Sequence, residues 1–74
     1  MKIGDICKVA KQPPNMFVNI VGEIGFISEI LEEYASFEAL KLDGSISGAG
    51  SIPLDCLIEE TNPIWIQAKK TRDD

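Results

Sequence analysis

The sequence contains no histidine, which removes the usual general base for a serine or cysteine nucleophile. It has only two cysteines, too few to complete the four-ligand shell of a structural zinc ion without histidine. Carboxylate pairs occur at 32–33 and 59–60, but adjacent residues of a strand point to opposite faces. We therefore expect no enzymatic activity, no metal and no cofactor.

Basic residues are also scarce, with seven against twelve acidic ones and a net charge of −5. Nucleic-acid affinity depends largely on neutralising phosphates with lysine and arginine, so a nucleic-acid partner is disfavoured. No apolar stretch approaches the ~20 residues of a membrane-spanning helix, and we expect no membrane partner. Met1 to Asp5 lacks the apolar core of a signal peptide, which favours a cytoplasmic location.

The 74 residues, 45% of them hydrophobic, are enough for one small domain. Alternation predicts a strand at 6–10 with Cys7 and Val9 on one face. Glycines within a strand mark a bend, a bulge or a close backbone approach, and the second strand contains two. The remaining signals predict an all-β fold of about five short strands. They are the strand with Gly22 and Gly25, the Asp43-Gly44 turn, a small-residue segment at 45–52, a 3₁₀ turn at 53–57 and a last strand at 58–60. The segment 45–52 is either an edge strand or a wide turn followed by a short strand.

The segment 29–42 fits two structures. Its large apolar residues recur at nearly helical spacing, which leaves open an α+β fold with a helix at about 29–41. The other interpretation is a hairpin loop at 32–34 and a strand at 36–42. We favour the strand, because Leu40 and Leu42 alternate up to the Asp43-Gly44 turn.

Four segments together resemble the SH3-like small β-barrels, in particular their KOW-type and translation-protein branch. They are Gly4-Asp5, 22–27, 40–44 and 52–57, and the resemblance covers roughly residues 3–60. It implies a single barrel at 1–60 whose interior is filled by side chains. Such barrels have many unrelated functions, so the fold alone does not identify one.

The resemblance implies two uses for the fold. One branch binds RNA or ribosomal surfaces through basic loops, and this chain departs from it because its loops are rich in glutamate. The other branch consists of accessory modules similar to photosynthetic electron-transfer subunits, the variable chain of ferredoxin-thioredoxin reductase and the β-chain domain of nitrile hydratase. Those modules dock against a larger catalytic partner. Peptide-binding SH3 domains fit less well, because their groove needs a row of aromatic residues.

Residues 61–74 form a C-terminal extension beyond the predicted barrel. The apolar run Ile64-Trp65-Ile66 predicts an extra strand, which either closes the barrel or docks a partner, followed by a polar tail. For Trp65, packing onto the barrel and contact with a partner therefore remain two equal alternatives.

The candidate partner-binding residues are Met16, Phe17, Tyr34 and Trp65, since aromatic and methionine side chains are common at interfaces. For Phe17 we favour packing onto the core over exposure. Cys7 and Cys56 form a candidate thiol pair; we expect both to be reduced and buried, with a disulfide left open.

Our hypothesis is a small non-catalytic interaction module, an accessory or adaptor subunit of a larger cytosolic complex. Its partner is another protein or a second copy of the chain. One alternative is an RNA- or ribosome-associated KOW-like module. The other is a thiol-based regulatory protein.

Overall fold

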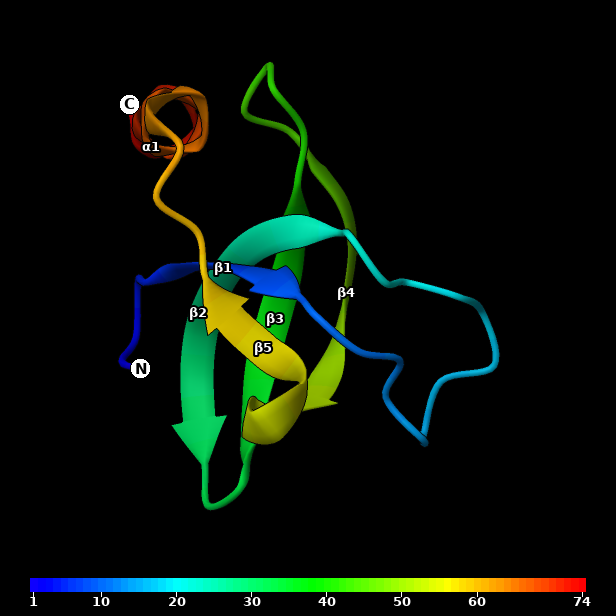
Figure 1. Ribbon diagram of the computed structural model, residues 1–74. Helices are drawn as coiled ribbons and strands as arrows, with labels where there is room; N and C mark the ends of the chain where they lie inside the picture. Colours follow the sequence, from blue (N-terminus) through cyan, green and yellow to red (C-terminus); the bar gives the residue numbers. More distant parts are fainter.

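The computed structural model describes residues 1–74 and consists of five antiparallel strands, a 3₁₀ turn and one helix (Figure 1). The strands lie in the order β4-β3-β2-β1-β5, so that β4 and β5 form the two edges of one curved sheet. The elements are β1 (Ile6–Val9), β2 (Ile24–Leu31), β3 (Tyr34–Leu40), β4 (Ile46–Pro53), η1 (Leu54–Cys56), β5 (Leu57–Glu59) and α1 (Pro63–Asp73). The predicted 3₁₀ turn is confirmed, and the small-residue segment forms an edge strand, the first of its two alternatives. Gly22, predicted within the second strand, instead lies in the turn before β2.

The main core lies inside the curve of the sheet. In β1, Cys7 and Val9 are fully buried whereas Ile6 and Lys8 are only partly buried, as the alternation predicted. Strands β2, β3 and β4, with the 3₁₀ turn and β5, supply the rest of one continuous cluster. Its buried members are Cys7, Val9, Ile27, Ala35, Phe37, Ile52, Cys56 and Leu57.

The segment 29–41 is part of a β-hairpin, and the alternative helix at this position is not formed. Strands β2 and β3 pair up to Leu31 and Tyr34, with Glu32 and Glu33 as the connecting turn. Alternate residues of β3 are buried, among them Ala35 and Phe37. The segment therefore follows the strand pattern, in which every second side chain is buried, and not the helical spacing of its larger side chains.

The turn between β3 and β4 forms at Asp43-Gly44 as predicted. Gly44 has a φ of 92°, a conformation that glycine adopts readily. The Asp43 carboxylate accepts hydrogen bonds from the Ser45 backbone N–H at 2.9 Å and from the Ser45 hydroxyl at 2.6 Å. These two bonds stabilise the charged form and lower the pKa of Asp43.

The prediction of an extra strand at Ile64-Trp65-Ile66 is wrong, because these residues form the first turn of helix α1. The Asn62 side chain accepts a hydrogen bond from the Ile64 N–H at 3.1 Å, and Pro63 occupies the first turn. This pair of residues is a standard helix start, and helix-forming residues follow it. The consecutive apolar residues suggested a strand, but their side chains point in different directions around the helix.

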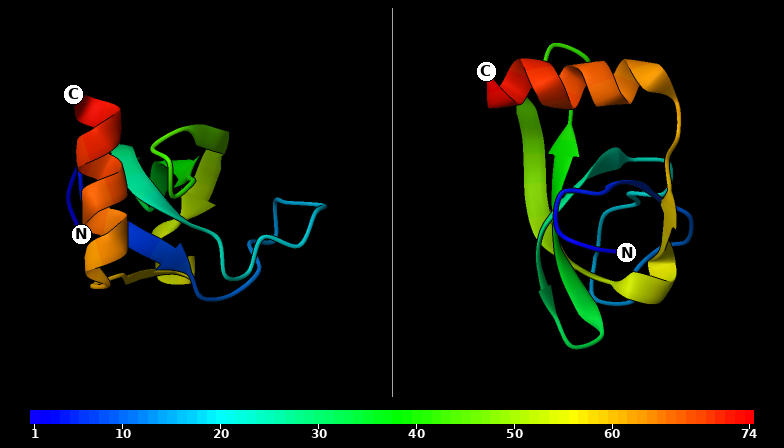
Figure 2. Two further views of the ribbon diagram at one scale, coloured as in Figure 1. Left: turned by 90° about the horizontal axis from the view of Figure 1, so that it is seen from above. Right: turned by 90° about the vertical axis from the view of Figure 1, so that its left-hand side faces the viewer.

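Helix α1 packs across the outer face of the sheet, beside the β3–β4 turn (Figure 2). Phe26, Leu40 and Ala68 form a second, smaller core with Trp65 and Ile46 at its margin. The Lys69 Nζ atom lies 4.6 Å from the centre of the Phe26 ring, a favourable cation–π geometry. The C-terminal segment thus belongs to the folded unit.

No helix of the protein combines the length and the apolar character that crossing a lipid bilayer requires.

Candidate interaction surfaces

The loop between β1 and β2, residues 10–23, is the largest irregular segment and projects from one side of the sheet (Figure 1). Two backbone hydrogen bonds close its base: Val9 N–H donates to Glu23 O and Gly22 N–H to Val9 O, both at 2.9 Å. Pro13 is fully buried and anchors the loop to the body of the protein. We call this segment the β1–β2 loop.

Gln12 holds the outer part of the β1–β2 loop in one conformation. Its Nε2 atom donates to Val18 O at 2.8 Å and to Met16 O at 3.2 Å. Its Oε1 atom accepts from the Ile20 N–H at 2.9 Å. One side chain therefore fixes the backbone on both sides of Phe17.

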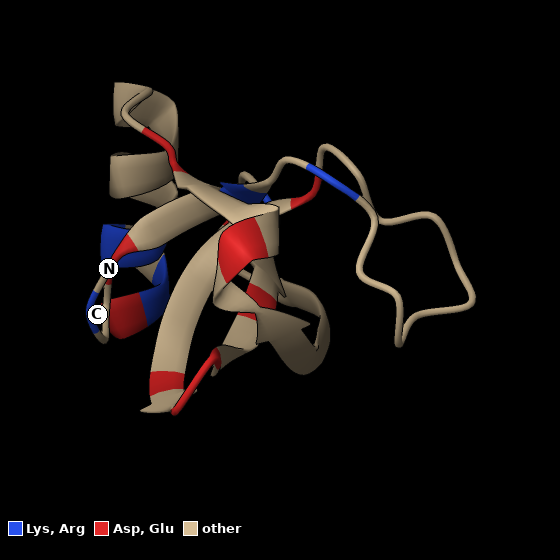
Figure 3. Ribbon diagram, turned by 60° about the horizontal axis from the view of Figure 1, so that its bottom comes forward, with Lys and Arg blue, Asp and Glu red and all other residues tan.

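Phe17 points into solvent, and its side chain is as exposed as in an unfolded chain. The expectation that Phe17 packs onto the core is wrong. The loop is anchored instead by Pro13 and by Ile20, which packs against the main core. Val18 is also mostly exposed, and no residue between Gln12 and Gly22 carries a charge (Figure 3). The loop thus presents an uncharged, apolar tip.

An apolar groove of about 370 Å³ separates the β1–β2 loop from strand β4. Met16 and Ile20 line it on the loop side, and Phe37 and Ile52 on the core side. The small residues 47–50 of β4 form its remaining wall. Met16, predicted as a partner-binding residue, lies in this groove.

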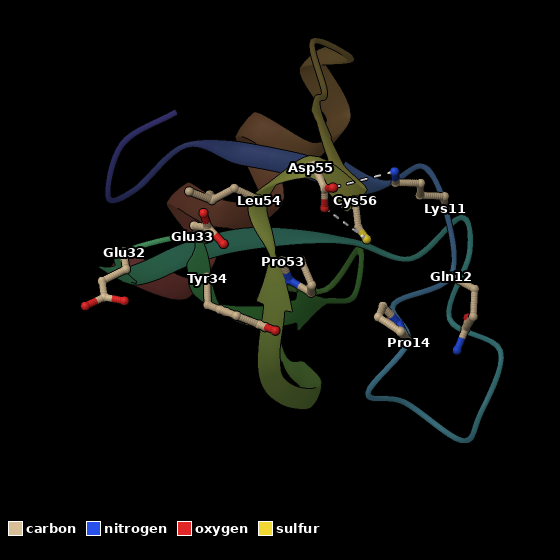
Figure 4. A pocket seen from close by; sticks show the side chains of 10 residues that line it. All are labelled: Lys11, Gln12, Pro14, Glu32, Glu33, Tyr34, Pro53, Leu54, Asp55 and Cys56. Carbon is tan, nitrogen blue, oxygen red and sulfur yellow. Dashed lines mark hydrogen bonds and ion pairs between the residues drawn. The ribbon is translucent and has the colours of Figure 1, made fainter.

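Tyr34 lies in a second, more polar cleft of about 740 Å³ at the opposite end of β4 (Figure 4). The β1–β2 loop, the β2–β3 turn and the 3₁₀ turn each contribute to its walls. Among the charged residues that line the cleft, Lys11 forms an ion pair with Asp55 at 3.7 Å. The net negative charge of the lining therefore comes from Glu32 and Glu33. This cleft is acidic and open, and Tyr34 is 42% exposed beside it.

Trp65 lies away from the other three candidates, on the helix that covers the outer face of the sheet. It is half-buried against the second core. The structure thus places Met16 and Phe17 on one loop but does not bring Tyr34 or Trp65 to the same surface.

Cys7 and Cys56 are both buried in the main core, and both are free thiols. Burial, with the nearby Asp5 carboxylate, raises the pKa of Cys7 to about 11. Burial and the Asp55 carboxylate also raise the pKa of Cys56, although Lys11 opposes this. The thiolate is the reactive form, so both thiols are poorly reactive near neutral pH.

The polar side chains lie at the surface of the protein. No polar or charged residue is buried, and no three cysteine, aspartate or glutamate side chains gather as metal ligands. The surface features that remain are the apolar loop tip and its groove, and the acidic cleft.

Local sequence patterns do not single out Gln12, the residue that orders the loop. A glutamine next to paired prolines is an ordinary loop composition. Its role depends on three backbone groups that only the folded loop brings around it.

Comparison with known proteins gives no match: no family model fits the chain, and no curated protein or solved structure is significantly similar to it.

Proposed function

We propose that this protein is a small non-catalytic interaction module that binds another protein through the tip of the β1–β2 loop. The observation that carries the proposal is the full exposure of Phe17 on a loop whose backbone is hydrogen-bonded to Gln12 on both sides of Phe17. Exposing an aromatic ring to water is unfavourable, and aromatic residues are frequent binding hot spots. A loop that is already ordered loses little entropy on binding.

The fold supports the same proposal. The strand order β4-β3-β2-β1-β5, with a 3₁₀ turn between β4 and β5, is the arrangement expected for an SH3-like barrel. We infer that the chain is of this type and serves as an accessory or adaptor subunit in the cytoplasm. Such a module positions a larger partner and contributes no catalytic residue.

The two alternatives have weaker support. An RNA-binding module would need a basic face formed by residues Lys2, Lys8, Lys11, Lys69, Lys70 and Arg72. Within this set, Lys69 pairs with Asp73 at 2.6 Å and Arg72 with Glu38 at 3.8 Å. A thiol-based regulator would need a reactive cysteine, and burial opposes this for Cys7 and Cys56.

The decisive substitution is Phe17→Ser in a tagged chain used to recover partners from its own cells. We expect at least a tenfold loss of the recovered partner, since hot-spot truncations cost ~2 kcal/mol or more. The measurement is quantitative mass spectrometry of the bound fraction. Leu42→Ser is the matched control: Leu42 is similarly apolar and exposed, but lies on the β3–β4 turn. Equal recovery by wild type and Phe17→Ser would refute the proposal.

A second variant tests whether the order of the loop matters. Gln12→Ala removes three hydrogen bonds but leaves Phe17 in place. We expect a loss of affinity of about five- to tenfold, because the partner must then order the loop at a cost of ~1 kcal/mol. Amide exchange at Ile20, whose N–H loses the Gln12 acceptor, should become faster. Unchanged exchange at Ile20 would show that Gln12 does not hold the loop.

A further inference from the structure

Strand β4 forms one edge of the sheet, and part of its backbone has no partner strand. On its outer side, Ser51 O accepts a hydrogen bond from Asn15 Nδ2 at 3.0 Å. In the ladder, Ser51 lies opposite Ser36 of β3. The Ser36 carbonyl oxygen accepts a hydrogen bond from the Ser28 hydroxyl of β2 at 3.2 Å, so it points towards β2 and not towards Ser51. Because backbone groups alternate along a strand, Ala49 and Ser51 turn their N–H and C=O groups away from β3.

The edge lacks the charged residues and prolines by which proteins often prevent strand pairing. Two features oppose pairing, namely the register shift next to Ser47 and the contact of Asn15 with Ser51 O. From Ile46 to Ile52 it carries no charge and no proline, and residues 47–49 and Ser51 are exposed. An added Cβ at Gly48 would meet no heavy atom within 4 Å. A long, uncharged edge of this kind is open to a further strand.

The sequence of β4 is symmetric about Ala49. Residues 46–52 read Ile-Ser-Gly-Ala-Gly-Ser-Ile, which is the same in both directions. When two copies of a strand pair antiparallel about a two-fold axis at Ala49, residue 47 faces 51 and residue 48 faces 50. Every residue then faces one of its own type, and the two serine pairs lie at equal distances from the axis.

We propose that two copies of the chain form a two-fold symmetric dimer by antiparallel pairing of their β4 strands, centred on Ala49. The free backbone groups agree with this register. Ala49 presents both its N–H and its C=O outward, so the two Ala49 residues form a hydrogen-bonded pair on the axis. The register shift between Ala39 and Leu40 leaves Ser47 with no paired residue on β3, although its hydroxyl donates to Ala39 O at 3.4 Å. In the dimer Ser47 faces Ser51 of the second copy.

The contact with Asn15 does not oppose the dimer strongly. Its hydrogen bond to Ser51 O is exposed, and pairing displaces it. The loss of one exposed hydrogen bond is small beside the two that the Ala49 pair forms.

The dimer is expected to be weak and to depend on salt. A strand pair buries less than the ~800 Å² per partner of a standard interface. Each copy also carries a net charge of −5, so the two repel each other at low ionic strength. Because β4 itself is uncharged, added salt should strengthen the association. Residues 47–50 of the edge also form a wall of the groove beside the β1–β2 loop, but Phe17 is not part of the edge. This proposal therefore does not rest on the proposed function, and the Phe17→Ser variant separates the two.

Charge substitutions at the axis test the register. Sedimentation equilibrium of the wild type should show a mass rising from 8.1 kDa towards twice that value with concentration. Ala49→Lys and Ala49→Glu should each remain monomeric, because like charges then face each other. An equimolar mixture of the two variants should dimerise again, since opposite charges then face each other across the axis. Ile58→Lys on β5, the other edge, is the matched control and should dimerise like the wild type.

Circular dichroism establishes that each variant folds, so that a loss of dimer cannot be a loss of structure. A wild type that stays at 8.1 kDa at millimolar concentration would overturn the proposal and leave the edge to a strand of another protein. A dimer that survives Ala49→Lys but is lost in Phe17→Ser would also overturn it, and would assign self-association to the loop.

Discussion

Replacing Gly25 by alanine is expected to lower the free energy of unfolding by about 3 kcal/mol or more. An added Cβ at this position would lie only 2.0 Å from Glu38 O and 2.8 Å from the Phe37 ring. The Glu38 oxygen belongs to the backbone of β3, the strand that pairs with β2 here, so relief requires the two strands to separate. A domain of this size has a total stability of only ~4–11 kcal/mol. The variant should therefore be largely destabilised or unfolded.

The measurement is thermal unfolding of dilute protein by circular dichroism. A loss of 3 kcal/mol corresponds to a decrease in Tm of roughly 12–24 °C for a domain of this length. Gly48→Ala is the matched control, because Gly48 lies in the neighbouring strand β4 with open space around it. A Tm for Gly25→Ala within about 4 °C of the wild type would show that β2 and β3 do not approach as closely as described.

The second large effect is a loss of stability at alkaline pH that depends on Cys7. Burial raises the pKa of this thiol from its ordinary value of 9.0 to about 11 in the folded protein. Between these values the folded state retains a proton that the unfolded state has lost. The stability from Cys7 is thus fully present below pH 9 and falls as the pH rises towards 11. The slope is ~1.4 kcal/mol per pH unit, or up to ~3 kcal/mol in all.

Urea unfolding at a series of pH values measures this slope. Cys7→Ala should flatten the slope between pH 9 and 11 relative to the wild type, whatever its effect on stability at neutral pH. Cys56→Ala retains Cys7 and should keep most of the dependence. Equal slopes for wild type and Cys7→Ala would show that the Cys7 thiol has the same pKa in the folded and the unfolded protein.

The strands were largely predictable from the sequence, because each depends on local patterns. The alternation at Cys7 and Val9, the glycine at position 25 and the Asp43-Gly44 turn all occur where expected. The segment 29–42 was ambiguous because its side chains satisfy two periods at once. Pairing of β3 with both β2 and β4 decides between them, and no single segment contains that information.

The candidate site was predicted less well. Phe17 was expected to pack onto the core, because a small core usually recruits every large side chain, but the structure leaves it exposed. Pro13 is the residue that anchors the loop instead. Trp65 belongs to a helix, and the capping residues Asn62 and Pro63 are a sequence signal for its start. The strand was predicted instead because the apolar run Ile64-Trp65-Ile66 was given more weight than this signal.

Composition and local pattern by themselves determined that this protein is small, acidic, rich in β-structure and without histidine. Only the tertiary structure decided which apolar side chains face water and which strand lies at an edge. The reason is that local sequence sets the direction of a side chain relative to its own backbone. Whether a neighbour covers that side chain depends on segments far away in the chain, as Phe17 and β4 demonstrate.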